Sequence, residues 1–97
     1  MIILYYEVIA DFMRDHATSR KPLNTWKTMA ENAVWKSFND IRKTDKDADR
    51  FGDCIIFNIG GKKFRLIAGV EYDAGIVTVK HVLTHAQYDR DKWKKDC

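Results

Sequence analysis

Four side chains in the second half of the sequence can hold phosphate and transfer protons: Arg65, Lys80, His85 and Tyr88. An arginine fork binds phosphate oxygens in pairs, lysine adds positive charge, and histidine exchanges a proton near neutral pH. If the segment is helical, Tyr88 lies beside His85 and its ring could stack on a base or assist proton transfer. In single-stranded RNA the ribose 2′-OH can attack the adjacent phosphate, which requires a base, an acid and positive charge but no metal ion. The four residues are therefore candidate catalytic residues for RNA cleavage.

Three apolar runs separated by glycine-bearing turns predict an antiparallel meander that would position these residues: 54–59, 64–72 and 76–83. Alternation places Arg65 on the face turned away from the helices. Lys80 joins Arg65 on that face only if the second turn has an even number of residues. By the same alternation His81 faces the core with Val79, which predicts a structural role for His81.

The first half of the sequence predicts helices that cover the other face of this sheet. Apolar residues follow a helical stripe within 7–15 and again from Leu23 to Val34, and Pro22 fits a first helical turn. Residues 37–40 resemble a capping box that opens a third short helix. We also expect a short strand at 2–6, an exposed connection at 43–50, and a final turn or short helix at 86–95. The predicted fold class is α+β: one domain, residues 1–97, with helices on one face of a small antiparallel sheet whose other face is partly open and positively charged.

Composition fits a small globular protein, since 45% of the 97 residues are hydrophobic and 32% are charged. No apolar run approaches the roughly 20 residues of a membrane helix, and residues 1–10 lack the features of a signal peptide. We therefore expect a cytoplasmic protein without a membrane partner. A net charge of +3 permits RNA or an acidic protein as partner and requires neither.

The sequence predicts no metal site and no cofactor. Cys54 and Cys97 belong to no CxxC pair or Cys/His cluster, so we expect two free thiols, with Cys54 acting as a small core residue. Asp45, Asp47 and Asp49 alternate in a loop that lacks the glycine and distal glutamate of an EF-hand. A solvated acidic loop is therefore favoured over a metal-dependent enzyme.

Each candidate residue also has a simpler interpretation as a solvated charge or a packed side chain. Three further lysines could bind RNA or could simply be solvated in a turn or tail: Lys62, Lys63 and Lys92. Arg65 and Lys80 interrupt apolar strands, so a functional and a solvated role weigh equally for them. Trp93, which lies among tail lysines, could stack on RNA, but packing on the domain is favoured.

Two linked segments resemble the signatures of one known family. The run FNIGGKKFRLI at 57–67 and the run THAQYD at 84–89 are similar to motifs of the HigB family, the toxins of type II toxin–antitoxin systems, related in fold to RelE. Four residues match family motif positions: Arg65, His85, Tyr88 and Asp89. Three depart from them, with Lys80 in place of a frequent arginine, Lys62 in place of asparagine and Phe64 in place of tyrosine.

The resemblance implies an endoribonuclease, an mRNA interferase that cuts messenger RNA on the translating ribosome and so inhibits translation. It also implies a HigA-type helix-turn-helix antitoxin as partner, which would cover the positive surface with acidic residues or hold the toxin away from the ribosome. The alternative hypothesis is a non-catalytic RelE-like module that binds an antitoxin, RNA or the ribosome. It stays open because nucleases of the RelE type often act without a strong histidine base.

Overall fold

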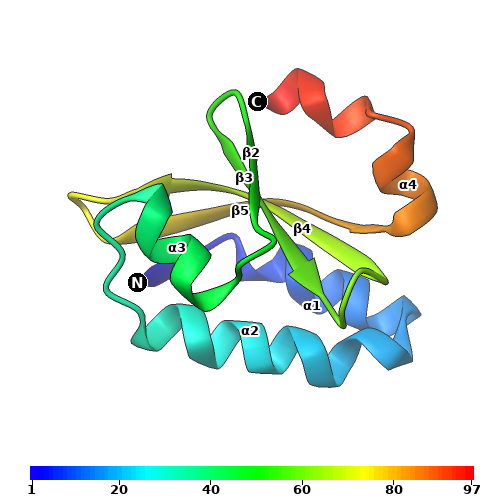
Figure 1. The fold of residues 1–97 in the computed structure, drawn as a ribbon. Coiled ribbons are helices and arrows are strands. Elements are labelled where there is room, and N and C mark those ends of the chain that lie inside the picture. Colours follow the sequence, from blue (N-terminus) through cyan, green and yellow to red (C-terminus); the bar gives the residue numbers. More distant parts are fainter.

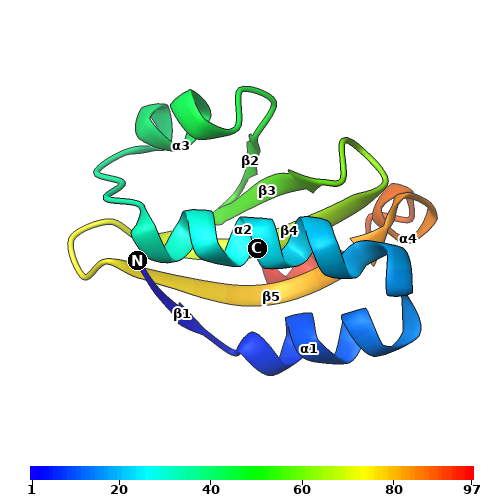
Figure 2. The same ribbon diagram turned by 90° about the horizontal axis from the view of Figure 1, so that it is seen from below.

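Helices α1 and α2 lie side by side across one face of a five-stranded sheet, in a computed structural model that describes residues 1–97 (Figures 1 and 2). The helices are α1 (Tyr6–Asp15), α2 (Arg20–Asn32), α3 (Phe38–Thr44) and α4 (His85–Asp89). The strands are β1 (Ile2–Leu4), β2 (Asp49–Phe51), β3 (Cys54–Ile59), β4 (Phe64–Glu71) and β5 (Ile76–Thr84). Short 3₁₀ turns follow α1 and α4, at Ala17–Ser19 and Lys92–Asp96. No helix is long and apolar enough to cross a membrane.

The α+β class and the meander β3–β4–β5 are confirmed, but the sheet is mixed rather than antiparallel. Its strand order is β1-β5-β4-β3-β2, and β1 pairs in parallel with β5. Parallel neighbours need a long crossover, and here the crossover contains helices α1 to α3 and strands β2 to β4. A strand's direction relative to its partner leaves no local sequence pattern, so the parallel edge was not predicted.

Helix α2 packs on the sheet through a stripe of side chains at helical spacing, Leu23, Trp26 and Ala30, all buried. The ring of Trp26 contacts Phe57 of β3 edge-on, with centroids 5.4 Å apart. This stripe and the inward side chains of β3, β4 and β5 form the main hydrophobic core. The core fixes the side of the sheet on which the helices lie.

A β-bulge in β5 changes which side chains face the core. Ile67 pairs with His81 whereas Ala68 pairs with Val79, so Lys80 is an extra residue with no partner in β4. Beyond the bulge Val82 is buried in the main core, and His81 lies opposite Ile67 on the outer face. The prediction that His81 shares the core face with Val79 was therefore wrong.

The outer face of the sheet is covered by the C-terminal segment, which folds back across it on the side away from α1 and α2 (Figure 1). Trp93 is only 3% exposed and packs on Ile56 and Ile67 in a second small core. Cys54 and Cys97 form a disulfide across this interface, with Cα atoms 5.4 Å apart. The expectation of two free thiols was wrong, because Trp93 buries itself on the apolar outer face and brings Cys97 to Cys54. The outer face stays partly open along β5, where Thr78, Lys80 and His81 are only half-buried.

Candidate functional site

Helix α4 starts directly where β5 ends and carries His85 at its first position. Thr84 and Gln87 form a reciprocal capping box: the Thr84 hydroxyl accepts the backbone N–H of Gln87, and the Gln87 side chain accepts that of Thr84. The backbone N–H of His85 donates to the carbonyl of Lys63 at 3.2 Å. The cap and this bond hold His85 beside the β3–β4 turn, which also carries the exposed Lys62.

The His85 side chain is exposed and paired within its own helix. Its Nδ1 lies 2.8 Å from a carboxylate oxygen of Asp89, one turn further along α4. The second ring nitrogen has no hydrogen-bond partner in the chain. A carboxylate that orients a histidine in this way is a common arrangement in acid–base catalysis.

Arg65 is nearly buried, with 8% of its surface exposed. Its Nη1 donates to the Lys62 carbonyl at 2.5 Å, which holds the β3–β4 turn. Its guanidinium carbon lies 5.0 Å from the centre of the Tyr88 ring, a cation–π contact. Through these two contacts Arg65 supports Tyr88 and the turn that carries the lysines.

Tyr88 is held between Arg65 and Trp93. Its ring stacks on Trp93 with centroids 5.1 Å apart, and its backbone carbonyl accepts the Trp93 indole N–H. Desolvation by burial, with the negative charge of Asp49 in second place, raises the pKa of Tyr88 above its usual value of 10.0. Its hydroxyl therefore stays protonated at neutral pH. Tyr88 points toward Arg65 and Trp93, whereas His85 pairs with Asp89.

Lys80 does not join this group. Its Nζ donates to the backbone carbonyl of Asp96 at 2.7 Å, beside His81, whose Nε2 lies 2.7 Å from the Asp96 carboxylate. Lys80 lies beside Gly69, four residues along β4 from Arg65, and the bulge adds His81 to the same outer face under the C-terminal segment. The structure thus groups Arg65, His85 and Tyr88 with the turn lysines and leaves Lys80 elsewhere.

A small basic cavity that the sequence did not predict lies on the other side of α4. The cavity has a volume of about 270 Å³. Its lining includes Gln87 and four groups that are or can become cationic: His81, Arg90, Lys92 and Lys95. The run Arg90 to Lys95 was a visible basic signal, but the position of His81 depends on the bulge. Basic side chains therefore lie near both ends of α4, with Lys63 at its start and Arg90 just after its end.

Comparison with known protein families shows which family the chain belongs to. The family model for the HigB toxin, the RelE-like toxic component of a toxin–antitoxin system, matches residues 19–91. The chain belongs to the HigB toxin family. No curated protein matches this HigB-family toxin. Membership implies an antitoxin partner, and the matched residues include the β3–β4 turn and α4 but end before Trp93, Asp96 and Cys97.

Proposed function

We propose that this toxin is an endoribonuclease, an mRNA interferase that cleaves messenger RNA by metal-independent acid–base catalysis. The observation that carries the proposal is the exposed His85–Asp89 pair, tied through the His85 backbone to the lysine-bearing β3–β4 turn. A proton-transfer group beside positive charge is what cleavage by the ribose 2′-OH requires. We propose further that residues 1–97 act as one RelE-like domain.

The proposed roles follow from the exposure of each group. The free ring nitrogen of His85 exchanges a proton with the 2′-OH or with the leaving 5′-oxygen. Lys62 and Lys63, both exposed, contact phosphate oxygens, and protonated Tyr88 supplies a second proton-transfer or stacking group. Arg65 acts as a positioning residue through Tyr88 and the Lys62 carbonyl.

Two of the lysines lie outside the proposed reaction centre. Lys80 adds positive charge at a distance, and Lys92 belongs to the basic cavity that follows α4. We propose that these residues extend the RNA path beyond the cleaved phosphate. The biological setting that fits is messenger RNA on a translating ribosome in the cytoplasm, with a HigA-type antitoxin as the inhibitor.

Expression of the toxin in growing cells tests the proposal. Wild type should arrest growth and cut translated messages, and loss of an acid–base group should lower cleavage about 10²- to 10⁴-fold in His85→Ala. Arg65→Ala should also relieve arrest, whereas Lys80→Ala should retain far more activity because its amine contacts only a backbone carbonyl. Undiminished toxicity in both His85→Ala and Arg65→Ala would refute the site.

A non-catalytic binding module is the second candidate, and one observation favours it. The two cations expected to clamp phosphate, Arg65 and Lys80, are already bonded to the backbone carbonyls of Lys62 and Asp96. Purified toxin that binds ribosomes but leaves translated messages intact would support this module. Cleavage sites that appear with wild type and vanish with His85→Ala would exclude it.

A further inference from the structure

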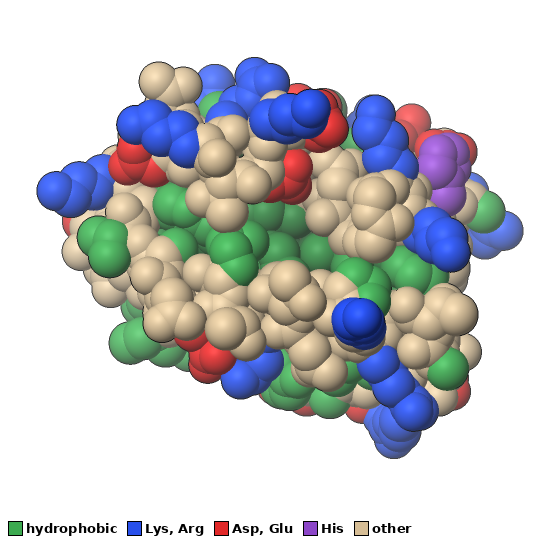
Figure 3. Space-filling model, turned by 60° about the horizontal axis from the view of Figure 1, so that its bottom comes forward, with side chains coloured by type: hydrophobic (Ala, Val, Ile, Leu, Met, Phe, Trp, Pro, Cys, Tyr) green, Lys and Arg blue, Asp and Glu red, His purple; other side chains and the backbone are tan.

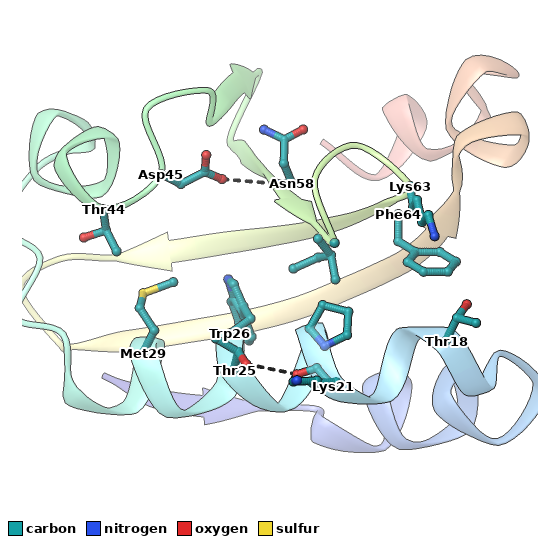
Figure 4. A pocket seen from close by; sticks show the side chains of 13 residues that line it. Thr18, Lys21, Thr25, Trp26, Met29, Thr44, Asp45, Asn58, Lys63 and Phe64 are labelled. Carbon is teal, nitrogen blue, oxygen red and sulfur yellow. Dashed lines mark hydrogen bonds between the residues drawn. The ribbon is translucent and has the colours of Figure 1, made fainter.

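An open cleft with an apolar floor lies between α2 and the β3–β4 hairpin, on the face of the sheet opposite the C-terminal segment (Figures 3 and 4). Its volume is about 730 Å³. The floor is formed by side chains of the main core, Trp26, Ile59 and Phe64. Thr25 and Met29 of α2 form one wall, and Asp45 lies on the opposite side. We call this region the α2 cleft.

One buried polar atom in the α2 cleft lacks a partner. Trp26 is 4% exposed, and its indole Nε1 is the one buried side-chain nitrogen or oxygen in the chain without a hydrogen bond. Figure 4 shows this nitrogen on the side of the ring away from α2. A buried donor without an acceptor destabilises the folded chain, because it has lost its hydrogen bond to water. An occupant that supplies an acceptor would replace this hydrogen bond.

The charges at the rim indicate the chemistry of the occupant. Lys21 and Lys63 line the cleft, and neither forms an ion pair within the chain. The carboxylate of Asp45 is already used, because it accepts the backbone N–H groups of Asp47 and Asn58. An apolar floor, an unused donor and two free cations favour a peptide with apolar and acidic side chains. They disfavour RNA, whose bases would find no exposed aromatic ring in the cleft, since Trp26 and Phe64 are buried.

We propose that the α2 cleft is the docking surface for the antitoxin that membership of the family implies. The segment that docks places an apolar side chain on the floor, an oxygen acceptor on Trp26 Nε1, and carboxylates beside Lys21 and Lys63. The backbone carbonyl of Lys63 also accepts the backbone N–H of His85, so a segment bound at Lys63 lies next to the proposed RNA site. Inhibition follows from occupation of Lys63 and obstruction of the turn. This last step rests on the proposed ribonuclease function, whereas the docking surface does not.

Binding of the full-length toxin to its purified HigA-type antitoxin tests the docking surface. Thr25→Arg fills the cleft from α2, and Thr28→Arg is the matched control on the same helix, outside the cleft lining. Arginine is a good helix former, so both variants should fold, and thermal melting checks this. We expect Thr25→Arg to weaken binding at least tenfold, which is about 1.4 kcal/mol, and Thr28→Arg to change it less than twofold. Lys21→Glu should weaken binding most at low salt.

Three results would overturn the proposal. The first is Thr25→Arg binding as tightly as wild type, and the second is Thr28→Arg binding as weakly as Thr25→Arg. The third is a self-association of the toxin that Thr25→Arg abolishes, because a second copy would then occupy the cleft.

The indole N–H signal of Trp26 in NMR spectra of wild type provides a readout that needs no variant. We expect antitoxin binding to shift this signal downfield and to slow its hydrogen exchange, whereas the Trp93 signal, already bonded to Tyr88, should move little. An unshifted Trp26 signal in the saturated complex would overturn the docking surface. Thr25→Arg should also remain toxic while escaping neutralisation. Normal docking by a non-toxic wild type would refute only the ribonuclease.

Discussion

Loss of the Cys54–Cys97 disulfide is expected to destabilise the toxin strongly. The bond joins residues separated by 43 positions, and the loop-closure model assigns about 4 kcal/mol to a loop of this length. Proteins of this size have a total stability of about 5–15 kcal/mol. Reduced toxin should therefore stay folded but become marginal. Trp93 should keep the segment docked, helped by the hydrogen bond from the Asp53 N–H to the Cys97 carbonyl.

Urea unfolding with and without dithiothreitol measures this effect. With a urea slope of about 1–3 kcal/mol/M, a loss of 4 kcal/mol lowers the midpoint by about 1–4 M. Cys97→Ala is the control: it should match the reduced protein, and dithiothreitol should not change its midpoint. Cys54→Ala is less suitable, because Cys54 is fully buried and its truncation leaves a cavity. Equal midpoints for oxidised and reduced wild type, or two titratable thiols in oxidised protein, would refute the reasoning.

Three further predictions concern the elements around α4. Trp93→Ala should lower the free energy of unfolding in urea by about 3–5 kcal/mol, because it empties the second core. A loss below about 1 kcal/mol would contradict the burial of Trp93. Thr84→Ala should lower the free energy of unfolding by about 0.5–2 kcal/mol and should lower cleavage by releasing His85. Thr84→Ser keeps the capping hydroxyl and should restore both stability and cleavage. Because the pKa of Tyr88 is raised by desolvation, stability should fall as pH rises from about 10 through the folded pKa. Tyr88→Phe should reduce the fall in the free energy of unfolding at alkaline pH, measured by urea titrations. A smaller fall should remain from Tyr72, because burial also raises the pKa of Tyr72. An unchanged fall would exclude Tyr88 as its source.

Parts of the candidate site that depend on neighbours in sequence were predictable. Helical spacing predicted the buried stripe of α2, and turn glycines predicted the three-stranded meander. The two motif runs indicated Arg65, His85 and Tyr88, which the structure places on adjacent elements. The near burial of Arg65 was not predictable, since it depends on Tyr88 and on the Trp93 ring stacked behind Tyr88.

The sequence by itself determined most elements of this toxin, because each depends on side chains two to four positions apart. Strand β2, which begins within the connection expected at 43–50 and pairs with β3, was not predicted. Only the tertiary structure decided three other features: the parallel pairing of β1, the bulge at Lys80, and the burial of the outer face under Trp93 and the disulfide. Each arises from contacts between residues distant in sequence, where the best packing of the whole sheet outweighs local alternation. For this reason His81 lies on the outer face with Lys80, and His85 remains exposed as the candidate acid–base residue.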